Sequence, residues 1–120
     1  MKTEVITYQY ENRDYSGYVA YPEKDLAPLV LIVHTWAGRD SFVEERAKDL
    51  AGLGYVAMAV DMYGDGEVGS STVENQSLMT PLVENRDRLK GVINATPVPI
   101  NFLLIISIDL LSFSSLNLLE

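Results

Sequence analysis

Residues 29–33 of this chain are all apolar, and this run constrains the fold more than any other feature of the sequence. A strand without polar residues must be buried on both faces, which is typical of a parallel sheet covered by helices. Residues 55–60 form a second such run, and the segment between the two runs has a helical pattern. We therefore predict a βαβ unit, whose crossover should be right-handed.

The segment between the two predicted strands carries the start and stop signals of a helix. Ser41 and Glu44 have the spacing of a capping box, which we expect to open the helix. Gly54 is expected to end it, because glycine readily takes the left-handed conformation that follows helix C-termini. The apolar side chains fall on one stripe, as in a helix that covers a sheet: Val43, Ala47, Leu50 and Ala51.

An antiparallel hairpin is predicted before this unit. Residues 5–10 and 15–21 are rich in aromatic and β-branched side chains, which favour strands. Residues 12–14, Asn-Arg-Asp, have turn chemistry and are short enough to join two antiparallel strands.

A further helical region is predicted after the unit, at residues 71–94. Ser71 and Glu74 again have capping-box spacing. Pro81 is expected to break or restart this helix with Thr80 as the new cap, because proline lacks the N–H of a helix interior.

Composition excludes several classes of function. The 120 residues hold 9 Lys and Arg against 17 Asp and Glu, a formal net charge of −8. That balance argues against binding nucleic acid, since phosphate contacts need a basic surface. There is no cysteine, so disulfides, thiolate metal sites and a cysteine nucleophile are absent from this sequence. No secretory signal pattern opens the chain, and we expect a cytoplasmic protein.

Residues 96–120 differ in composition from residues 1–95, which hold all nine basic residues. Three interpretations of this atypical apolar tail stay open: a membrane anchor, a native strand and helix of the same domain, or sequence foreign to the original design, such as a shifted frame. Asp109 in mid-span, with no flanking Lys or Arg, argues against the anchor. The abrupt change in composition favours the third interpretation.

Chemistry is expected in the two loops after the buried strands, because ligands of open α/β sheets bind beyond the carboxyl ends of the strands. Neither loop carries a dinucleotide-binding or Walker motif. His34 has no second His or Cys with which to hold a metal, so we interpret it as a hydrogen-bond partner of loop backbone. Asp61 is interpreted as a structural anchor of its own loop, whereas Trp36 either lines a pocket or covers the core.

The first loop has one combination of features that suggests catalysis. His34 follows a buried strand, Gly38 comes four residues later, and a capped helix follows. Such a loop can direct a backbone N–H toward negative charge that develops during acyl transfer, as in an oxyanion hole.

In this order, residues 29–38, then 45–57, then Asp61-Met62-Tyr63-Gly64, resemble the dienelactone hydrolase family. Residues 18–22 and the helix with Arg86, Arg88 and Leu89 extend the likeness to about residues 3–95. The resemblance implies an α/β-hydrolase fold that acts on ester or lactone bonds through a Cys-His-Asp triad. It also implies that no metal and no organic cofactor is needed.

The resemblance also assigns roles to the first loop. It implies that the backbone N–H of Trp36 is one oxyanion donor. Thr35 stands where several family members have a Glu that contacts the nucleophile, and its hydroxyl cannot replace the charge of that carboxylate. His34 precedes the place of the nucleophile, whereas this fold runs nucleophile, acid, histidine, so it is not the triad histidine. Trp36, Thr35, His34 and Gly38 are therefore the predicted oxyanion and pocket residues, and Asp61, Tyr63 and Gly64 the predicted structural loop.

The nucleophile elbow of the family, Gly-x-Cys-x-Gly or Gly-x-Ser-x-Gly, occurs nowhere in the sequence. Ser107 is the nearest substitute, but Ile105 and Asp109 stand where the strained elbow requires small residues. We therefore assign no catalytic residue and no metal ligand.

The sequence thus predicts a partial α/β-hydrolase fold: a hairpin, a βαβ unit and a further helix, with residues 1–95 as the N-terminal half of the domain. We expect a truncated ester or lactone hydrolase, inactive alone, whose partner is a small-molecule ester or lactone. The alternatives are a non-catalytic binding module around Trp36 and Tyr63, or a membrane-tethered fragment. If residues 102–106 do not cover the edge of the 29–33 strand, self-association through that edge is expected.

Overall fold

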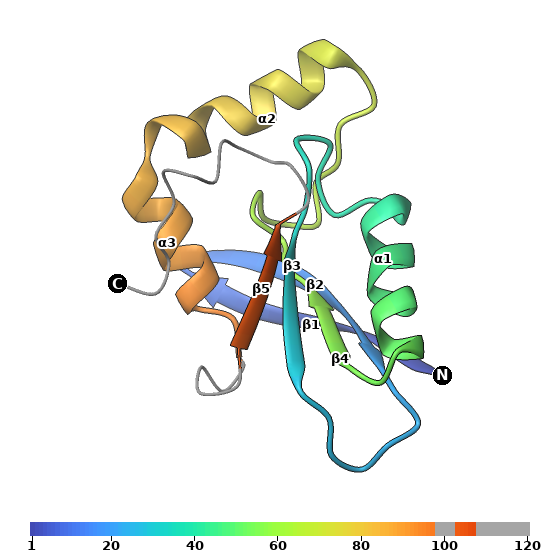
Figure 1. Ribbon diagram of the computed structural model, residues 1–120. Coiled ribbons are helices and arrows are strands. Elements are labelled where there is room, and N and C mark those ends of the chain that lie inside the picture. Colours follow the sequence, from blue (N-terminus) through green and yellow to red (C-terminus); the bar gives the residue numbers. More distant parts are fainter. Residues whose placement is uncertain (98–102, 108–120) are drawn as a thin grey trace.

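The computed structural model describes residues 1–97 and 103–107, which form a five-stranded sheet with three helices (Figure 1). The strand order is β1-β2-β4-β3-β5. The strands are β1 (Lys2–Tyr10), β2 (Arg13–Tyr21), β3 (Leu29–Val33), β4 (Val56–Ala59) and β5 (Leu103–Ser107), and the helices are α1 (Ser41–Gly52), α2 (Thr72–Glu84) and α3 (Arg86–Asn94). This arrangement confirms the predicted α/β class.

The predicted hairpin is confirmed, with both strands beginning earlier than expected. β1 and β2 pair antiparallel along their whole length, from Lys2 opposite Tyr21 to Tyr10 opposite Arg13. The connection is the pair Glu11 and Asn12, whose φ angles of 49° and 63° are both positive. A two-residue turn of this kind matches the right-handed twist of the strands that it joins.

The βαβ unit is also confirmed: β3 and β4 are parallel neighbours, and α1 connects them. The predicted cap of α1 is wrong by one residue, because Asp40 and not Ser41 is the N-cap. Asp40 has extended backbone angles, and its carboxylate accepts a hydrogen bond from the Val43 N–H at 3.3 Å. Gly54 follows the helix with φ 103°, as predicted.

The second helical region divides at a different place than predicted. Ser71 caps α2 through a hydrogen bond from the Glu74 N–H to its hydroxyl, as expected. α2 then runs through Pro81 without restarting, and Thr80 donates to the Gln76 carbonyl instead of capping a new helix. A proline removes one helical hydrogen bond, and the exposed face of α2 tolerates that loss. The break falls at Asn85, whose side chain accepts from the Arg88 N–H and caps α3.

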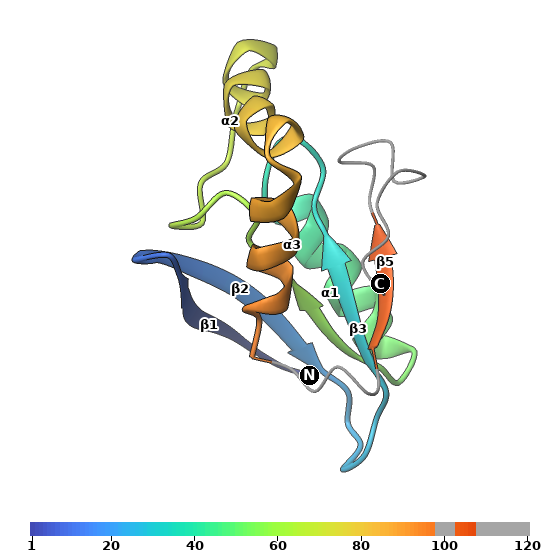
Figure 2. The ribbon, with the colours of Figure 1, turned by 90° about the vertical axis from the view of Figure 1, so that its left-hand side faces the viewer.

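The helices cover both faces of the sheet (Figures 1 and 2). Alternate residues of β3 serve the two layers: Val30 and Ile32 pack with the buried face of α1, and Leu31 and Val33 belong to the core on the side of α2 and α3. β3 is therefore buried on both faces, as its uniform apolar sequence predicts.

Part of the apolar tail joins this sheet. β5 pairs parallel with β3, with Leu103 opposite Leu29 and Ser107 opposite Val33. β5 therefore covers the edge of β3 that the sequence left without a defined partner. Asp109 and the remainder of the tail lie outside the described residues, as do residues 98–102. In the part of the chain that the structure describes, no helix is long and apolar enough to cross a membrane.

Candidate oxyanion site

The candidate site lies where β3 and β4 end. The two strands are parallel neighbours, so their carboxyl ends meet at one edge of the sheet, and the loops that follow them lie against each other. The loop after β3 begins at His34 and the loop after β4 includes Asp61. A hydrogen bond of 3.0 Å from the Met62 N–H to Nε2 of His34 connects them directly.

Asp61 anchors the second loop, as predicted. Its side chain is fully buried, and its two carboxylate oxygens accept four backbone hydrogen bonds of 2.8–3.1 Å. One oxygen binds the N–H groups of Tyr63 and Gly64, and the other binds those of Ser16 and Gly66. Because Ser16 belongs to β2, this carboxylate also attaches the loop to the hairpin.

Three successive carbonyls fix the backbone of the first loop. The Thr35 carbonyl accepts from the Gly38 N–H at 3.0 Å and faces Nδ1 of His34 at 2.7 Å. The Trp36 carbonyl accepts from the Tyr63 hydroxyl at 2.8 Å, and the Ala37 carbonyl accepts a backbone bond of 2.8 Å from the segment before α2. Each peptide plane between residues 35 and 38 is therefore held by a neighbour, and a planar trans peptide then fixes the direction of its own N–H.

The N–H of Trp36 differs in its hydrogen bonding from the two N–H groups that follow it. The Ala37 N–H donates to the Thr35 hydroxyl at 3.3 Å, and the Gly38 N–H donates to the Thr35 carbonyl. Within residues 1–97 and 103–107, the Trp36 N–H has no such partner. It is the donor that the family resemblance assigns to the oxyanion, and the Thr35 hydroxyl is already used inside the loop.

His34 contacts backbone on both of its ring nitrogens, as predicted. Nε2 accepts from Met62, so Nδ1 carries the proton and donates to the Thr35 carbonyl. The side chain is fully buried, and this burial lowers the pKa of the imidazole below its usual value. His34 is therefore neutral near pH 7. Among the described residues no group of three or more His, Cys, Asp or Glu is placed to hold a metal.

The two aromatic residues of the site have different surroundings. Tyr63 is buried with its ring 4.7 Å from that of His34, and burial raises the pKa of its hydroxyl. Because that hydroxyl donates its proton to the Trp36 carbonyl, this donor is already used inside the loop. Trp36 is 36% exposed, so part of this residue faces solvent.

Gly38 and Gly64 hold positions that a side chain cannot occupy. Gly38 has φ 99°, and a Cβ added there would lie 2.5 Å from the Glu67 carbonyl oxygen. Gly64 has φ 96°, and its Cβ would meet the guanidinium of Arg13. Both glycines let another chain segment approach the loops closely.

The sequence matches the family model for the dienelactone hydrolase family over residues 15–102. The chain belongs to that family. The match includes both loops, and the likeness predicted from the sequence is confirmed.

Solved structures of dienelactone hydrolases have the same fold. The protein named m3DLH is 26% identical to this chain, with a TM-score of 0.75, and the match covers 88% of this chain and 48% of m3DLH. The dienelactone hydrolase-like promiscuous phosphotriesterase P91 from metagenomic libraries is 22% identical, with a TM-score of 0.74 and coverages of 88% and 48%. A putative dienelactone hydrolase from Klebsiella pneumoniae is 17% identical, with a TM-score of 0.61 and coverages of 88% and 49%. This dienelactone hydrolase family chain thus spans about half the length of these proteins. A comparison with curated protein sequences finds no match.

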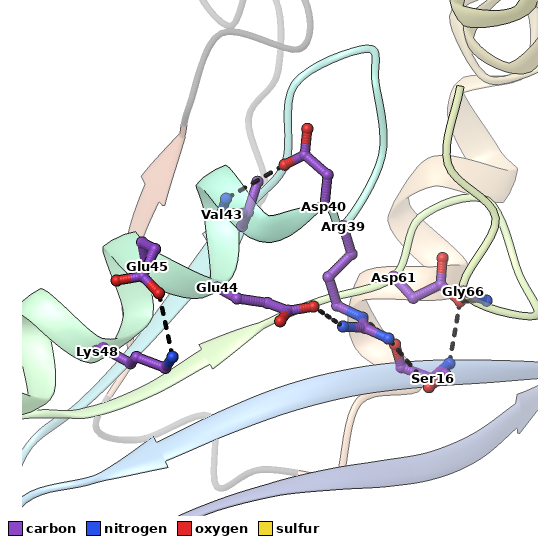
Figure 3. A network of polar contacts seen from close by, with 9 residues as sticks. All are labelled: Ser16, Arg39, Asp40, Val43, Glu44, Glu45, Lys48, Asp61 and Gly66. Atoms are coloured by element: carbon purple, nitrogen blue, oxygen red, sulfur yellow. Dashed lines mark hydrogen bonds and ion pairs between the residues drawn. The ribbon is translucent and has the colours of Figure 1, made fainter. Parts of the chain in front are cut away.

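Sequence reasoning missed one polar cluster beside the site of this dienelactone hydrolase family chain (Figure 3). The Arg39 side chain is only 10% exposed and donates to the Ser16 carbonyl at 2.6 Å, to the Ser16 hydroxyl at 3.3 Å and to the Glu44 carboxylate at 2.9 Å. It therefore joins the first loop to β2 and to α1. The position of Arg39 between a loop glycine and a helix cap was the available signal in the sequence. Nothing in the sequence around Ser16 marks that serine as the partner of Arg39.

Proposed function

We propose that this chain provides the oxyanion-binding half of an ester or lactone hydrolase and does not hydrolyse esters alone. The observation that carries the proposal is the Trp36 N–H, left without a hydrogen-bond partner among the described residues while the carbonyls of residues 35–38 all accept hydrogen bonds. Family membership supports the choice of an ester or lactone as the substrate class.

The chemistry of the loop fits the stabilisation of the oxyanion that forms during acyl transfer. When a nucleophile adds to a carbonyl, the oxygen gains negative charge, and an N–H held in advance stabilises it without reorganising. Hydrogen bonds to the carbonyls of residues 35–37 hold the backbone around this N–H, so the donor is fixed before a substrate binds. The loop can therefore bind the developing charge, but it contributes no attacking atom.

Nothing in the site can act as the nucleophile or its base. The Thr35 hydroxyl accepts a hydrogen bond from the Ala37 N–H at 3.3 Å. Among the described residues it has no hydrogen bond to a basic side chain that could take its proton. Both nitrogens of His34 are bound to backbone, which leaves no lone pair for proton transfer to a substrate. Ser107, at the end of β5, lacks the small flanking residues of an elbow. An oxyanion donor without a triad leaves only a small remainder of catalysis.

We expect the purified 120-residue chain to hydrolyse p-nitrophenyl acetate no faster than an equal concentration of a non-enzymatic protein. The physical reason is that no side chain of the site can form the acyl intermediate. Release of p-nitrophenolate at 405 nm is the measurement, and mass spectrometry of the intact protein after incubation is the control for a slow covalent step. Saturable turnover, or an added acyl mass on any side chain, contradicts the proposal.

The oxyanion donor itself is tested by an anion of tetrahedral shape. We expect methyl phenylphosphonate, a monoanion, to shift the Trp36 backbone amide in a ¹H–¹⁵N NMR spectrum with a Kd of about 1–10 mM, since one hydrogen bond gives weak binding. Dimethyl phenylphosphonate, which is neutral and of nearly the same shape, is the control and should shift this amide little. Equal responses to both compounds, or no response at Trp36, contradict the assignment of the donor.

A further inference from the structure

We infer that His34 is a positioning residue whose neutral imidazole joins the loop of the Trp36 N–H to the loop after β4, so that acid weakens this connection. The inference rests on the proposed function for the role of the Trp36 N–H. The structural part, a connection between two loops that depends on the protonation state of His34, stands on the contacts of the ring itself.

The first contact fixes the donor peptide. Thr35 supplies the C=O and Trp36 the N–H of a single planar peptide group, and Nδ1 of His34 binds that C=O at 2.7 Å. Any rotation of this peptide that redirects the Trp36 N–H must break the bond to His34. A hydrogen bond accepted by a carbonyl also polarises the peptide and makes its N–H a stronger donor.

The second contact joins the two loops. Nε2 of His34 accepts from the Met62 N–H at 3.0 Å, which requires a bare nitrogen. When the imidazole gains a proton, Nε2 becomes a donor that faces another donor, and the bond is lost. The ring of Tyr63, 4.7 Å away, packs on the same imidazole and carries the hydroxyl that holds the Trp36 carbonyl. Displacement of the His34 ring therefore disturbs the hydrogen bonds that hold the Thr35 carbonyl and the Trp36 carbonyl, which flank the Trp36 N–H.

The charged groups near the ring come from both loops and from the start of α1. The complete burial of the ring lowers the pKa of His34, and Arg39 acts in the same direction. The hydrogen bond to the Thr35 carbonyl and the charges of Asp61 and Asp40 favour the imidazolium, but burial outweighs them. The sign follows. The bond that Nε2 accepts from the Met62 N–H is fully present above the ordinary His pKa of about 6.5 and weakens as the pH falls below it, until the folded imidazole itself takes up a proton. The bond from Nδ1 to the Thr35 carbonyl is made by both protonation states.

We expect the opening of the loop, measured as the amide-exchange protection of Met62 after correction for the intrinsic exchange rate, to change with pH. Protection should fall by up to about tenfold per pH unit below pH 6.5, because the open form binds the proton more tightly than the closed form. His34→Gln is the matched variant: its amide oxygen replaces Nε2 as an acceptor for Met62 but does not titrate. Its Met62 protection should stay constant between pH 7 and pH 5. Identical pH profiles of the wild-type chain and His34→Gln overturn the inference.

A measurement on the wild-type chain alone covers the case in which His34→Gln does not fold. The imidazole ¹⁵N shifts at pH 7.5 should show a protonated Nδ1 and a bare Nε2. The opposite tautomer, or an imidazolium at that pH, overturns the inference.

Methyl phenylphosphonate separates this inference from the proposed function, because it remains a monoanion from pH 7 to pH 5. The Trp36 response should weaken at pH 5 in the wild-type chain and persist in His34→Gln. If Met62 protection changes with pH while Trp36 never responds to the phosphonate, the loop connection stands and the oxyanion role fails. If Trp36 responds equally at both pH values and Met62 protection is constant, the donor stands and the role of His34 fails.

Discussion

Replacing Asp61 with alanine should lower the free energy of unfolding by about 3–5 kcal/mol, the largest effect that we expect from any single side chain near the site. The change removes an acceptor of four backbone hydrogen bonds and leaves the N–H groups of Ser16, Tyr63, Gly64 and Gly66 without it. Hydrogen bonds to a buried charged group contribute about 1.5–3 kcal/mol each, and unpaired buried donors add a desolvation penalty. Water entering the vacated space recovers part of this sum. Urea unfolding followed by circular dichroism measures the difference.

Two variants control for the loss of a negative charge and for the change of shape. Asp61→Asn keeps the shape and one acceptor oxygen, so its destabilisation should be smaller than that of Asp61→Ala. Asp49→Ala removes a carboxylate from α1 that is 61% exposed and pairs with Arg46 at 2.9 Å, and it should change stability by less than about 1 kcal/mol. Asp61→Ala as mild as Asp49→Ala would show that the four contacts do not hold the loop.

The parts of the fold that follow from local pattern are those that the sequence predicts well. The uniform apolar run of β3 demands burial on both faces, and the structure buries it between α1 and the α2–α3 layer. The apolar stripe of α1 likewise has one possible destination, and Val43, Ala47 and Ala51 are buried against the sheet. Periodicity succeeds here because the two layers need nothing beyond apolar area in the right places.

Element boundaries depend on competition between neighbours, which pattern alone does not resolve. Asp40 and Ser41 are both good N-caps, and the structure uses Asp40, the residue next to the buried Arg39. Pro81 was expected to divide the helical region, but Asn85 offers a side-chain cap and Pro81 costs a single bond on an exposed face. In both cases the sequence contains two acceptable solutions, and tertiary contacts select one.

In the site, too, the sequence predicts what a residue does better than it predicts which distant residue it contacts. The sequence predicts that Asp61 anchors its loop, because an aspartate after a buried strand has backbone N–H groups within reach. It does not predict the bond to Ser16, 45 residues away, or that of Arg39 to the same residue. The Trp36 N–H is harder still, since its lack of a partner among the described residues depends on the hydrogen bonds of its neighbours. The family resemblance implies its role, and the structure shows which contacts hold the peptide groups around it.

Gly38→Ala is the substitution that should damage the loop after β3 most directly. We expect it to lower the free energy of unfolding by about 2–4 kcal/mol, because φ 99° is strained for alanine and the new Cβ lies 2.5 Å from the Glu67 carbonyl oxygen. The neighbouring group belongs to the backbone, so rotation of a side chain cannot relieve the overlap. The short antiparallel bridge between Gly38 and Val68 should open in response. Thermal or urea unfolding gives the loss of stability, and the Trp36 amide should lose its response to methyl phenylphosphonate.

Gly52→Ala is the matched control, since it makes the same chemical change in α1. A Cβ at Gly52 meets nothing within 4 Å, and alanine restricts the unfolded chain more than glycine does. We therefore expect a gain of about 0.5–1 kcal/mol and an unchanged Trp36 response. The difference in sign between the two variants is what tests the structure, because a general intolerance of added methyl groups would destabilise both. A stable Gly38→Ala chain that still binds the phosphonate through Trp36 would mean that the approach of residues 67–68 does not shape the loop.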